Sequence, residues 1–202
     1  SYLVYGGPTG TAGVIELSNL EVGNGAAGFV LRGVNFGDGS GGAVSSAGDV
    51  NGDGFDDMLV GARLAEVGTS VSLSIQGETY VVYGGPAGTD GVIELSNLEV
   101  GNGSTGFVLR GVSRGDFSGV SVSSAGDVNG DGFDDLIVGA YGAAVDGGPI
   151  RPGASYVVYG GPAGNVAVID LSSLNAGDGS TGFVLLGSKY VQIRENMGKH
   201  PN

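Results

Sequence analysis

A repeated unit limits the possible folds of this chain more than any other feature. The run Tyr-Leu-Val-Tyr-Gly-Gly-Pro begins at Tyr2 and returns almost unchanged at Tyr80 and Tyr156, at spacings of 78 and 76 residues. Residues 6–33 also match residues 84–111 nearly letter for letter, and residues 160–187 follow with more differences. A period of this length indicates one supersecondary unit that is built several times and packs against its own copies.

Each unit contains four short runs rich in β-branched and aromatic residues, which predict β-strands because Gly and Asn clusters bound them. The expected strands are residues 42–47 and 119–125 (first), 57–62 and 135–140 (second), 79–83 and 155–159 (third), and 29–32, 107–110 and 183–186 (fourth). A further extended piece is expected at residues 14–17, 92–95 and 168–171. No segment has a sustained helical period, and a hydrophobic fraction of 41% supplies a core, so the predicted class is all-β.

An acidic loop follows the first expected strand of each fuller unit. It reads Asp-Val-Asn-Gly-Asp-Gly-Phe-Asp-Asp at residues 49–57 and again at residues 127–135. Side-chain oxygens fall at positions 1, 3, 5 and 9, a Gly at position 6 permits a sharp turn, and position 7 can offer its backbone carbonyl. Such an all-oxygen set favours a hard cation, calcium before magnesium. The predicted ligands are Asp49, Asn51, Asp53, the Phe55 carbonyl, Asp57, Asp127, Asn129, Asp131, the Phe133 carbonyl and Asp135.

The loop has two other interpretations. An EF-hand needs a bidentate Glu at position 12, where this chain has Val60 and Val138, and the apolar run after position 9 predicts a strand instead of a helix. A plain acidic turn between two strands is the simpler alternative. It is disfavoured because several carboxylates within nine residues repel one another when no cation is bound.

Charge and composition exclude several functions. The formal net charge is −13, from 21 acidic and 8 basic residues, so neither nucleic acid nor an anionic membrane surface is an expected partner. No apolar run reaches the length of a membrane span, so membrane insertion is not expected. The chain has no Cys, which leaves the redox compartment undetermined, and its one His, His200, lies in an atypical tail. Because neither a Ser-His nor a Cys-His pair can be assembled, no enzyme activity is predicted.

The unit resembles the FG-GAP repeat of integrin α-subunit β-propellers and their bacterial relatives. The likeness rests on Asp-x-Asn-x-Asp-Gly-x-x-Asp, on the apolar run ending in Val-Gly-Ala (residues 60–62 and 138–140), and on Tyr-Val-Val-Tyr-Gly. Phe36 and Gly37 stand where the family has its Phe-Gly, whereas the next unit departs from the pattern with Arg114 and Gly115. The resemblance covers residues 1–187 and implies four-stranded antiparallel blades with calcium in the hairpin loop between the first two strands.

That resemblance divides the chain into parts. Residues 1–33 would form a partial blade with strands three and four, residues 34–111 and 112–187 two blades with calcium loops, and residues 188–202 an atypical tail. This makes about two and a half blades, an incomplete ring, whereas propellers close with about four to eight. We therefore expect either self-association or a longer propeller chain around this sequence.

The predicted function is that of a calcium-binding propeller segment in a secreted or cell-surface protein, acting in adhesion or recognition. A protein or glycan ligand would bind the face formed by the loops between strands two and three and between blades. The alternatives are a non-catalytic accessory region of a larger extracellular hydrolase, or a sugar-binding (lectin) propeller. The tripeptide Arg114-Gly115-Asp116, a known integrin ligand sequence, aligns with Phe36-Gly37-Asp38 and is interpreted as part of the scaffold.

Overall fold

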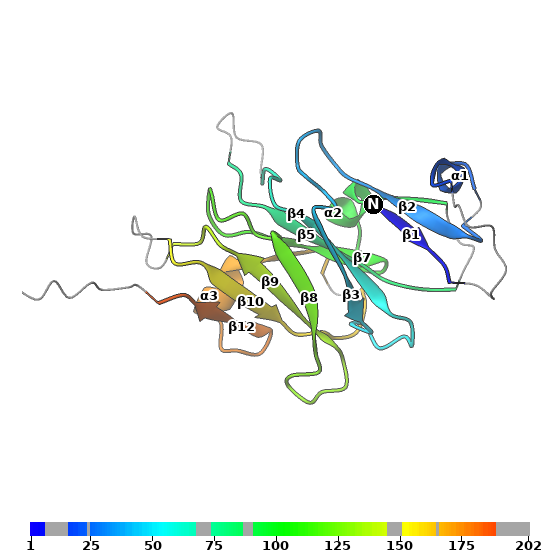
Figure 1. Ribbon diagram of the computed structural model, residues 1–202. Coiled ribbons are helices and arrows are strands. Elements are labelled where there is room, and N and C mark those ends of the chain that lie inside the picture. Colours follow the sequence, from blue (N-terminus) through cyan, green and yellow to red (C-terminus); the bar gives the residue numbers. More distant parts are fainter. Residues whose placement is uncertain are drawn as a thin grey trace, which may run out of the picture.

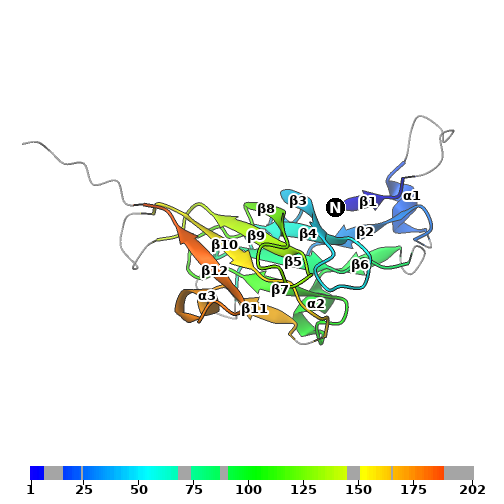
Figure 2. The same cartoon turned by 90° about the horizontal axis from the view of Figure 1, so that it is seen from below.

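Three β-sheets lie side by side in the computed structural model (Figures 1 and 2), which describes residues 1–6, 16–23, 25–67, 74–86, 91–144, 151–164 and 166–188. Sheet 1 has the order β1 (Tyr2–Val4), β2 (Gly28–Arg32), β6 (Val92–Glu94). Sheet 2 has the order β11 (Val168–Asp170), β7 (Gly106–Arg110), β5 (Glu78–Val82), β4 (Asp57–Ala62), β3 (Ala43–Gly48). Sheet 3 has the order β12 (Gly182–Leu186), β10 (Ala154–Val158), β9 (Asp135–Ala140), β8 (Ser121–Gly126). Within the described residues the sheets do not close into a ring. The arrangement is that of one part of a β-propeller.

The predicted all-β class and the four strands of each fuller unit are confirmed, with strand ends that differ by at most two residues. In sheet 2, β3, β4, β5 and β7 pair antiparallel in that order, and β8, β9, β10 and β12 repeat the arrangement in sheet 3. The register repeats as well, because Val44 pairs with Val60 and Val122 pairs with Val138. Sheets 2 and 3 therefore contain the same four-stranded unit, as the repeated sequence predicts.

The further extended piece crosses to a neighbouring sheet. β6 pairs in parallel with β2, and β11 pairs in parallel with β7, so each adds a short strand to the outer edge of the preceding unit. The first counterpart, residues 14–17, lies partly outside the described residues, and Leu17 stands at a helix N-cap. These crossing strands tie successive units together through backbone hydrogen bonds.

Three short helices were not expected from the sequence: α1 (Ser18–Glu21), α2 (Ser96–Val100) and α3 (Ser172–Ala176). Each spans about one turn, which is too short to produce a helical period in the sequence. Apolar packing holds α2 in place. Leu95 and Leu98 are buried under β7, at 0% and 2% exposure. No helix among the described residues has the length and apolar character needed to cross a membrane.

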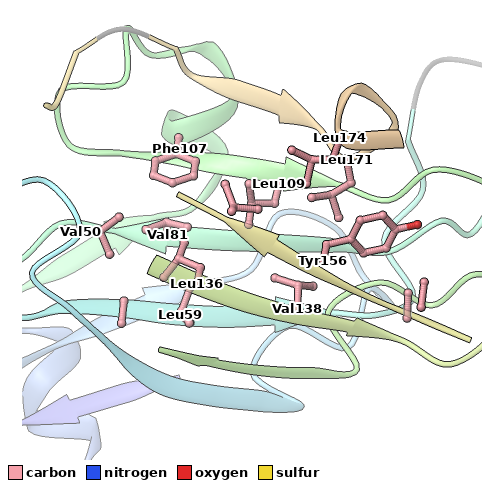
Figure 3. Packing of buried hydrophobic residues seen from close by; sticks show 14 of the residues in the cluster. Val50, Leu59, Val81, Phe107, Leu109, Leu136, Val138, Tyr156, Leu171 and Leu174 are labelled. Carbon is pink, nitrogen blue, oxygen red and sulfur yellow. The ribbon is translucent and has the colours of Figure 1, made fainter. Parts of the chain in front are cut away.

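The core lies between the sheets, because each strand points alternate side chains toward its two neighbours. Between sheets 2 and 3, Leu59 and Val81 face Leu136 and Val138, with Phe107 beside them (Figure 3). Six residues of these strands are at most 6% exposed and belong to the buried clusters between the sheets, namely Val60, Val138, Tyr80, Val82, Phe107 and Leu109.

Candidate metal-binding loops

The two acidic loops are β-hairpin connections. Loop one (residues 49–57) joins β3 to β4, and loop two (residues 127–135) joins β8 to β9. Gly54 and Gly132 at position 6 have φ of 90° and 95°, a left-handed conformation that residues with a side chain rarely adopt. The predicted sharp turn is therefore present in both loops.

The carboxylate at position 1 organises each loop from within. Asp49 accepts backbone N–H bonds from Gly52, Asp53 and Gly54 at 2.8, 3.0 and 2.9 Å. In loop two, Asp127 accepts the equivalent bonds from Gly130, Asp131 and Gly132, at 2.7, 3.1 and 3.0 Å. All of these bonds lie within the loop itself, and they hold it in its curled form.

The side chains at positions 3 and 5 lie next to each other. The Asn51 amide nitrogen donates to the Asp53 carboxylate at 2.9 Å, and the corresponding distance from Asn129 to Asp131 is 2.8 Å. The amide oxygens of Asn51 and Asn129 accept the backbone N–H of Asp53 and Asp131, both at 2.9 Å. Ligation of a cation by either oxygen would therefore require the Asn amide to turn and this bond to break.

The carboxylate at position 9 is buried and held by backbone N–H groups. Asp57 is 1% exposed and accepts bonds from Val50 at 2.9 Å and Gly84 at 2.8 Å. Burial raises the pKa of Asp57 to about 6, the two backbone bonds oppose this rise, and the charges of Asp53 and Asp49 add to it. The negative charges of Asp49 and Asp53 therefore repel that of Asp57 and disfavour its ionised form.

Asp135 occupies the equivalent place in loop two. It is 0% exposed and accepts bonds from Val128 at 2.8 Å and from Gly160 at 3.0 Å. In both loops the position-9 carboxylate thus ties the hairpin to the second residue after the third strand of the unit. A carboxylate has about four lone-pair sites, so two such bonds leave capacity for a cation.

The residues present fit calcium by their chemistry, although the carboxylates alone do not complete a site. Among the described residues, no three His, Cys, Asp or Glu side chains converge closely enough to hold a metal ion. The amide oxygen at position 3 and the backbone carbonyl at position 7 are needed to complete the predicted set. None of the ion pairs that the described residues form involves a loop carboxylate, so no cationic side chain offsets the charge there.

A contact between the two loops was missed by the sequence analysis. Asp134, at position 8 of loop two, accepts the Asp49 N–H on its carboxylate at 2.9 Å and donates its own N–H to the Asp49 carbonyl at 3.1 Å. The Phe133 ring lies against Gly52 so closely that a Cβ there would meet it at 2.6 Å. In the sequence, the only feature that could have indicated this contact is the Asp-Asp doublet that ends both loops.

The Arg114-Gly115-Asp116 tripeptide does not present its carboxylate. Asp116 is 2% exposed, accepts the Ser113 N–H at 2.8 Å and lies 3.5 Å from the Arg151 guanidinium. Burial raises its pKa, while the Ser113 bond and Arg151 oppose that rise. Asp38 is likewise buried and accepts a bond from the residue three positions before it, so both Asp residues hold their own turns.

Comparison with known proteins agrees with this geometry. A family model described as "FG-GAP repeat" matches residues 40–73 and 118–169, which include both loops. Both matched stretches carry FG-GAP repeats. The chain is also 39% identical over 116 residues to integrin alpha-3 of Cricetulus griseus, and this alignment covers 55% of the chain and 9% of that protein.

Similar matches reach invertebrate integrins. Integrin alpha-PS2 of Drosophila melanogaster is 35% identical over 122 residues, covering 59% of the chain and 8% of that protein. Integrin alpha pat-2 of Caenorhabditis elegans is 35% identical over 101 residues, covering 49% of the chain and 7% of that protein. The matched region is therefore less than a tenth of each of these relatives.

Proposed function

We propose that this FG-GAP chain is a calcium-binding, non-catalytic β-propeller segment of a secreted or cell-surface protein, where it acts in adhesion or protein recognition. The observation that carries the proposal is the loop that occurs twice with the same internal hydrogen bonds. We also propose that residues 34–111 and 112–187 are two blades, residues 1–33 a partial blade and residues 188–202 an atypical tail. The tail beyond residue 188 lies outside the described residues.

Calcium would relieve the charge repulsion within each loop. Asp49, Asn51, Asp53, Asp57 and the Phe55 carbonyl would hold one ion, and the equivalent residues of loop two a second. Extracellular calcium modules have dissociation constants of about 10⁻⁴ to 10⁻³ M. A site in the presence of calcium at about ten times this constant stabilises the fold by roughly 1.4 kcal/mol.

Titration calorimetry tests the metal proposal. We expect two calcium ions per chain for the unmodified protein and one for Asp131→Ala, because Asp131 is an exposed ligand whose removal leaves the core intact. Asp56→Ala is the matched control, since it removes an exposed acid from position 8, which is not a predicted ligand. Absence of calcium uptake at millimolar concentration, or equal uptake in both variants, contradicts the proposal.

The recognition face we propose lies at the strand ends opposite the two loops, where β2 connects to β3, β4 to β5 and β9 to β10. Exposed aromatic side chains occur on these connections. Phe36 is fully exposed, and Tyr141 is 57% exposed and stacks on Phe117 with ring centroids 5.2 Å apart. Arg151 lies beside them and donates to the Arg114 carbonyl at 3.2 Å. Aromatic and Arg side chains dominate the energetics of many protein interfaces.

Binding to a panel of immobilised extracellular-matrix proteins, and in parallel to a glycan array, tests the recognition proposal. We expect a protein ligand whose binding in millimolar calcium falls at least tenfold in the Tyr141→Ala variant. Val128→Ala is the control, because Val128 is similarly exposed, at 51%, but lies on loop two at the other end of the strands. Binding to glycans alone would assign the chain to a lectin instead.

A further inference from the structure

The turn between β7 and β8 carries different side chains from its counterpart in the preceding unit. Phe117 stands where the preceding unit has Gly39, and Arg114 stands where it has Phe36. The two turns nevertheless share one backbone design, because in each the buried Asp accepts the N–H of the residue three positions earlier, at 3.0 and 2.8 Å. The differences therefore concern side chains on a common scaffold.

Phe117 has a backbone conformation that is unfavourable for a residue with a side chain. Its φ is 55°, and it is the one residue other than Gly with a positive φ in the part of the chain that the structure describes. Gly39 has a φ of 68°, so the preceding unit places at this position the residue that adopts the conformation without strain. A bulky residue in the left-handed region is rare, and such strain is concentrated at functional sites. The Phe117 ring is therefore a candidate functional group.

The Phe117 ring forms a flat, partly exposed pair with Tyr141. The two rings are stacked, with an interplanar angle of 4° and centroids 5.2 Å apart, and Tyr141 is 57% exposed. Gly142 leaves room for this pair, because a Cβ there would meet the Phe117 ring at 3.1 Å. The preceding unit has Arg63 in place of Tyr141, so neither ring belongs to the repeated sequence.

Arg151 fixes the position of the aromatic pair relative to the turn. Its guanidinium donates to the Gly142 carbonyl at 2.6 Å and to the Arg114 carbonyl at 3.2 Å, and it lies 3.5 Å from the buried Asp116 carboxylate. The connection from β9 to β10 is thereby tied to the connection from β7 to β8. The preceding unit has Ile75 at this position, so it lacks the tie. A surface that is already held in place loses little conformational entropy when a ligand binds.

The exposed charges at this end of the strands are mainly positive. On the connections from β2 to β3, β4 to β5, β7 to β8 and β9 to β10, the charged side chains that are described and exposed are Arg63, Glu66, Arg114 and Arg151. Arg151 has a counter-charge in Asp116, whereas Arg114 forms no ion pair with another described residue. The acidic loops lie at the opposite end of the strands, in a chain whose net charge is −13. This distribution steers an acidic ligand toward Arg114 and a basic ligand toward the loops.

We propose that Arg114, Phe117 and Tyr141 form a binding site for an acidic peptide segment that carries an aromatic side chain. Arg114 binds a carboxylate of the segment, with which a guanidinium can form two parallel hydrogen bonds. The aromatic side chain of the segment packs against the stacked pair. A neutral sugar could also contact the rings but would leave the Arg114 charge without a partner. This rests on the proposed function, because the segment binds the recognition face described there.

Selection from a display library of short random peptides tests the ligand class. The 202-residue chain is immobilised in millimolar calcium, and the Arg114→Ala variant is used in parallel. We expect the enriched peptides to carry Asp or Glu beside an aromatic residue, and to be absent from the selection on Arg114→Ala. Enrichment of basic or uncharged peptides overturns this inference but leaves the recognition face in place, as does a matrix protein bound through Tyr141 when no peptide is enriched.

Fluorescence anisotropy with an enriched peptide then measures the contribution of Arg114. We expect Arg114→Ala to raise the dissociation constant at least about tenfold, and higher salt to weaken binding to the unmodified chain. Arg32→Ala is the matched control, since it removes a half-exposed Arg that pairs with Glu94 on sheet 1. An equal loss of affinity in both variants would show that binding follows net charge alone, and would overturn the proposal.

Phe117→Gly separates a role of the ring in binding from a role in folding. This variant restores the residue of the preceding unit at the left-handed position, so we expect a melting temperature that is unchanged or higher. The peptide affinity should fall at least about tenfold, because the stacked pair is lost. A lower melting temperature with unchanged affinity would assign the ring to stability and overturn the proposal. Peptide binding that EDTA abolishes and Arg114→Ala leaves unchanged would place the acidic ligand on loop-bound calcium, and would also overturn it.

Discussion

The contact between the two loops leads to a prediction about Asp134. Asp134→Ala removes the carboxylate that accepts the Asp49 N–H at 2.9 Å, while the bond from the Asp134 N–H to the Asp49 carbonyl can remain. A hydrogen bond to a charged group contributes about 1.5–3 kcal/mol to stability. Water can reach this half-buried position, and loss of one negative charge reduces repulsion within the loop, so we expect a net cost of about 1 kcal/mol.

Asp56→Ala provides the control for that estimate. Asp56 occupies position 8 of loop one but is exposed and makes no recorded side-chain bond among the described residues. The relief of charge repulsion is similar in both variants, so the difference between them isolates the bond between the loops. For a domain of this size, about 1 kcal/mol corresponds to a melting temperature lower by roughly 2–4 °C.

Urea unfolding followed by circular dichroism, with calcium removed by EDTA, measures this difference. We expect Asp134→Ala to unfold at lower urea concentration than Asp56→Ala, with the same slope for both. Equal midpoints would show that the bond between the loops contributes nothing to stability, and the inferred coupling between sheets 2 and 3 through their loops would be wrong.

Three further predictions concern close contacts within and between the sheets. Val138→Asp places an unpaired charge at a fully buried position and should prevent folding, so a native-like melting curve would contradict the stacked arrangement. Arg110→Met removes the partner of buried Glu78, 3.1 Å away, and should cost about 2–3 kcal/mol at pH 7. Because burial already raises the pKa of Glu78, this loss should shrink as the pH falls toward that raised pKa and Glu78 takes up a proton, which urea unfolding across pH would show. Gly61→Ala should destabilise more than Gly139→Ala in thermal melts, because its Cβ would meet the backbone carbonyl of Gly119, in the connection before β8, whereas at Gly139 it meets a Ser hydroxyl.

The sequence by itself determined the repeated unit, its four strands and the hairpin loops. These features depend on residues close together in the chain. The alternation of Val and Tyr defines a strand, and the Asp and Gly spacing defines a loop that forms its own hydrogen bonds, as Asp49 does with the three residues at positions 4 to 6. Local patterns of this kind give the same structure in each copy, which is why the register also repeats.

Only the tertiary structure decided which groups from different units meet. The parallel pairing of β6 with β2, the bond from Asp49 to Asp134 and the exposure of Val44 beside the burial of Val122 join residues far apart in the sequence. Val44 and Val122 stand in nearly identical local sequence, so no local pattern could separate them. Their environments differ because a neighbouring sheet covers one and not the other, and burial depends on that neighbour.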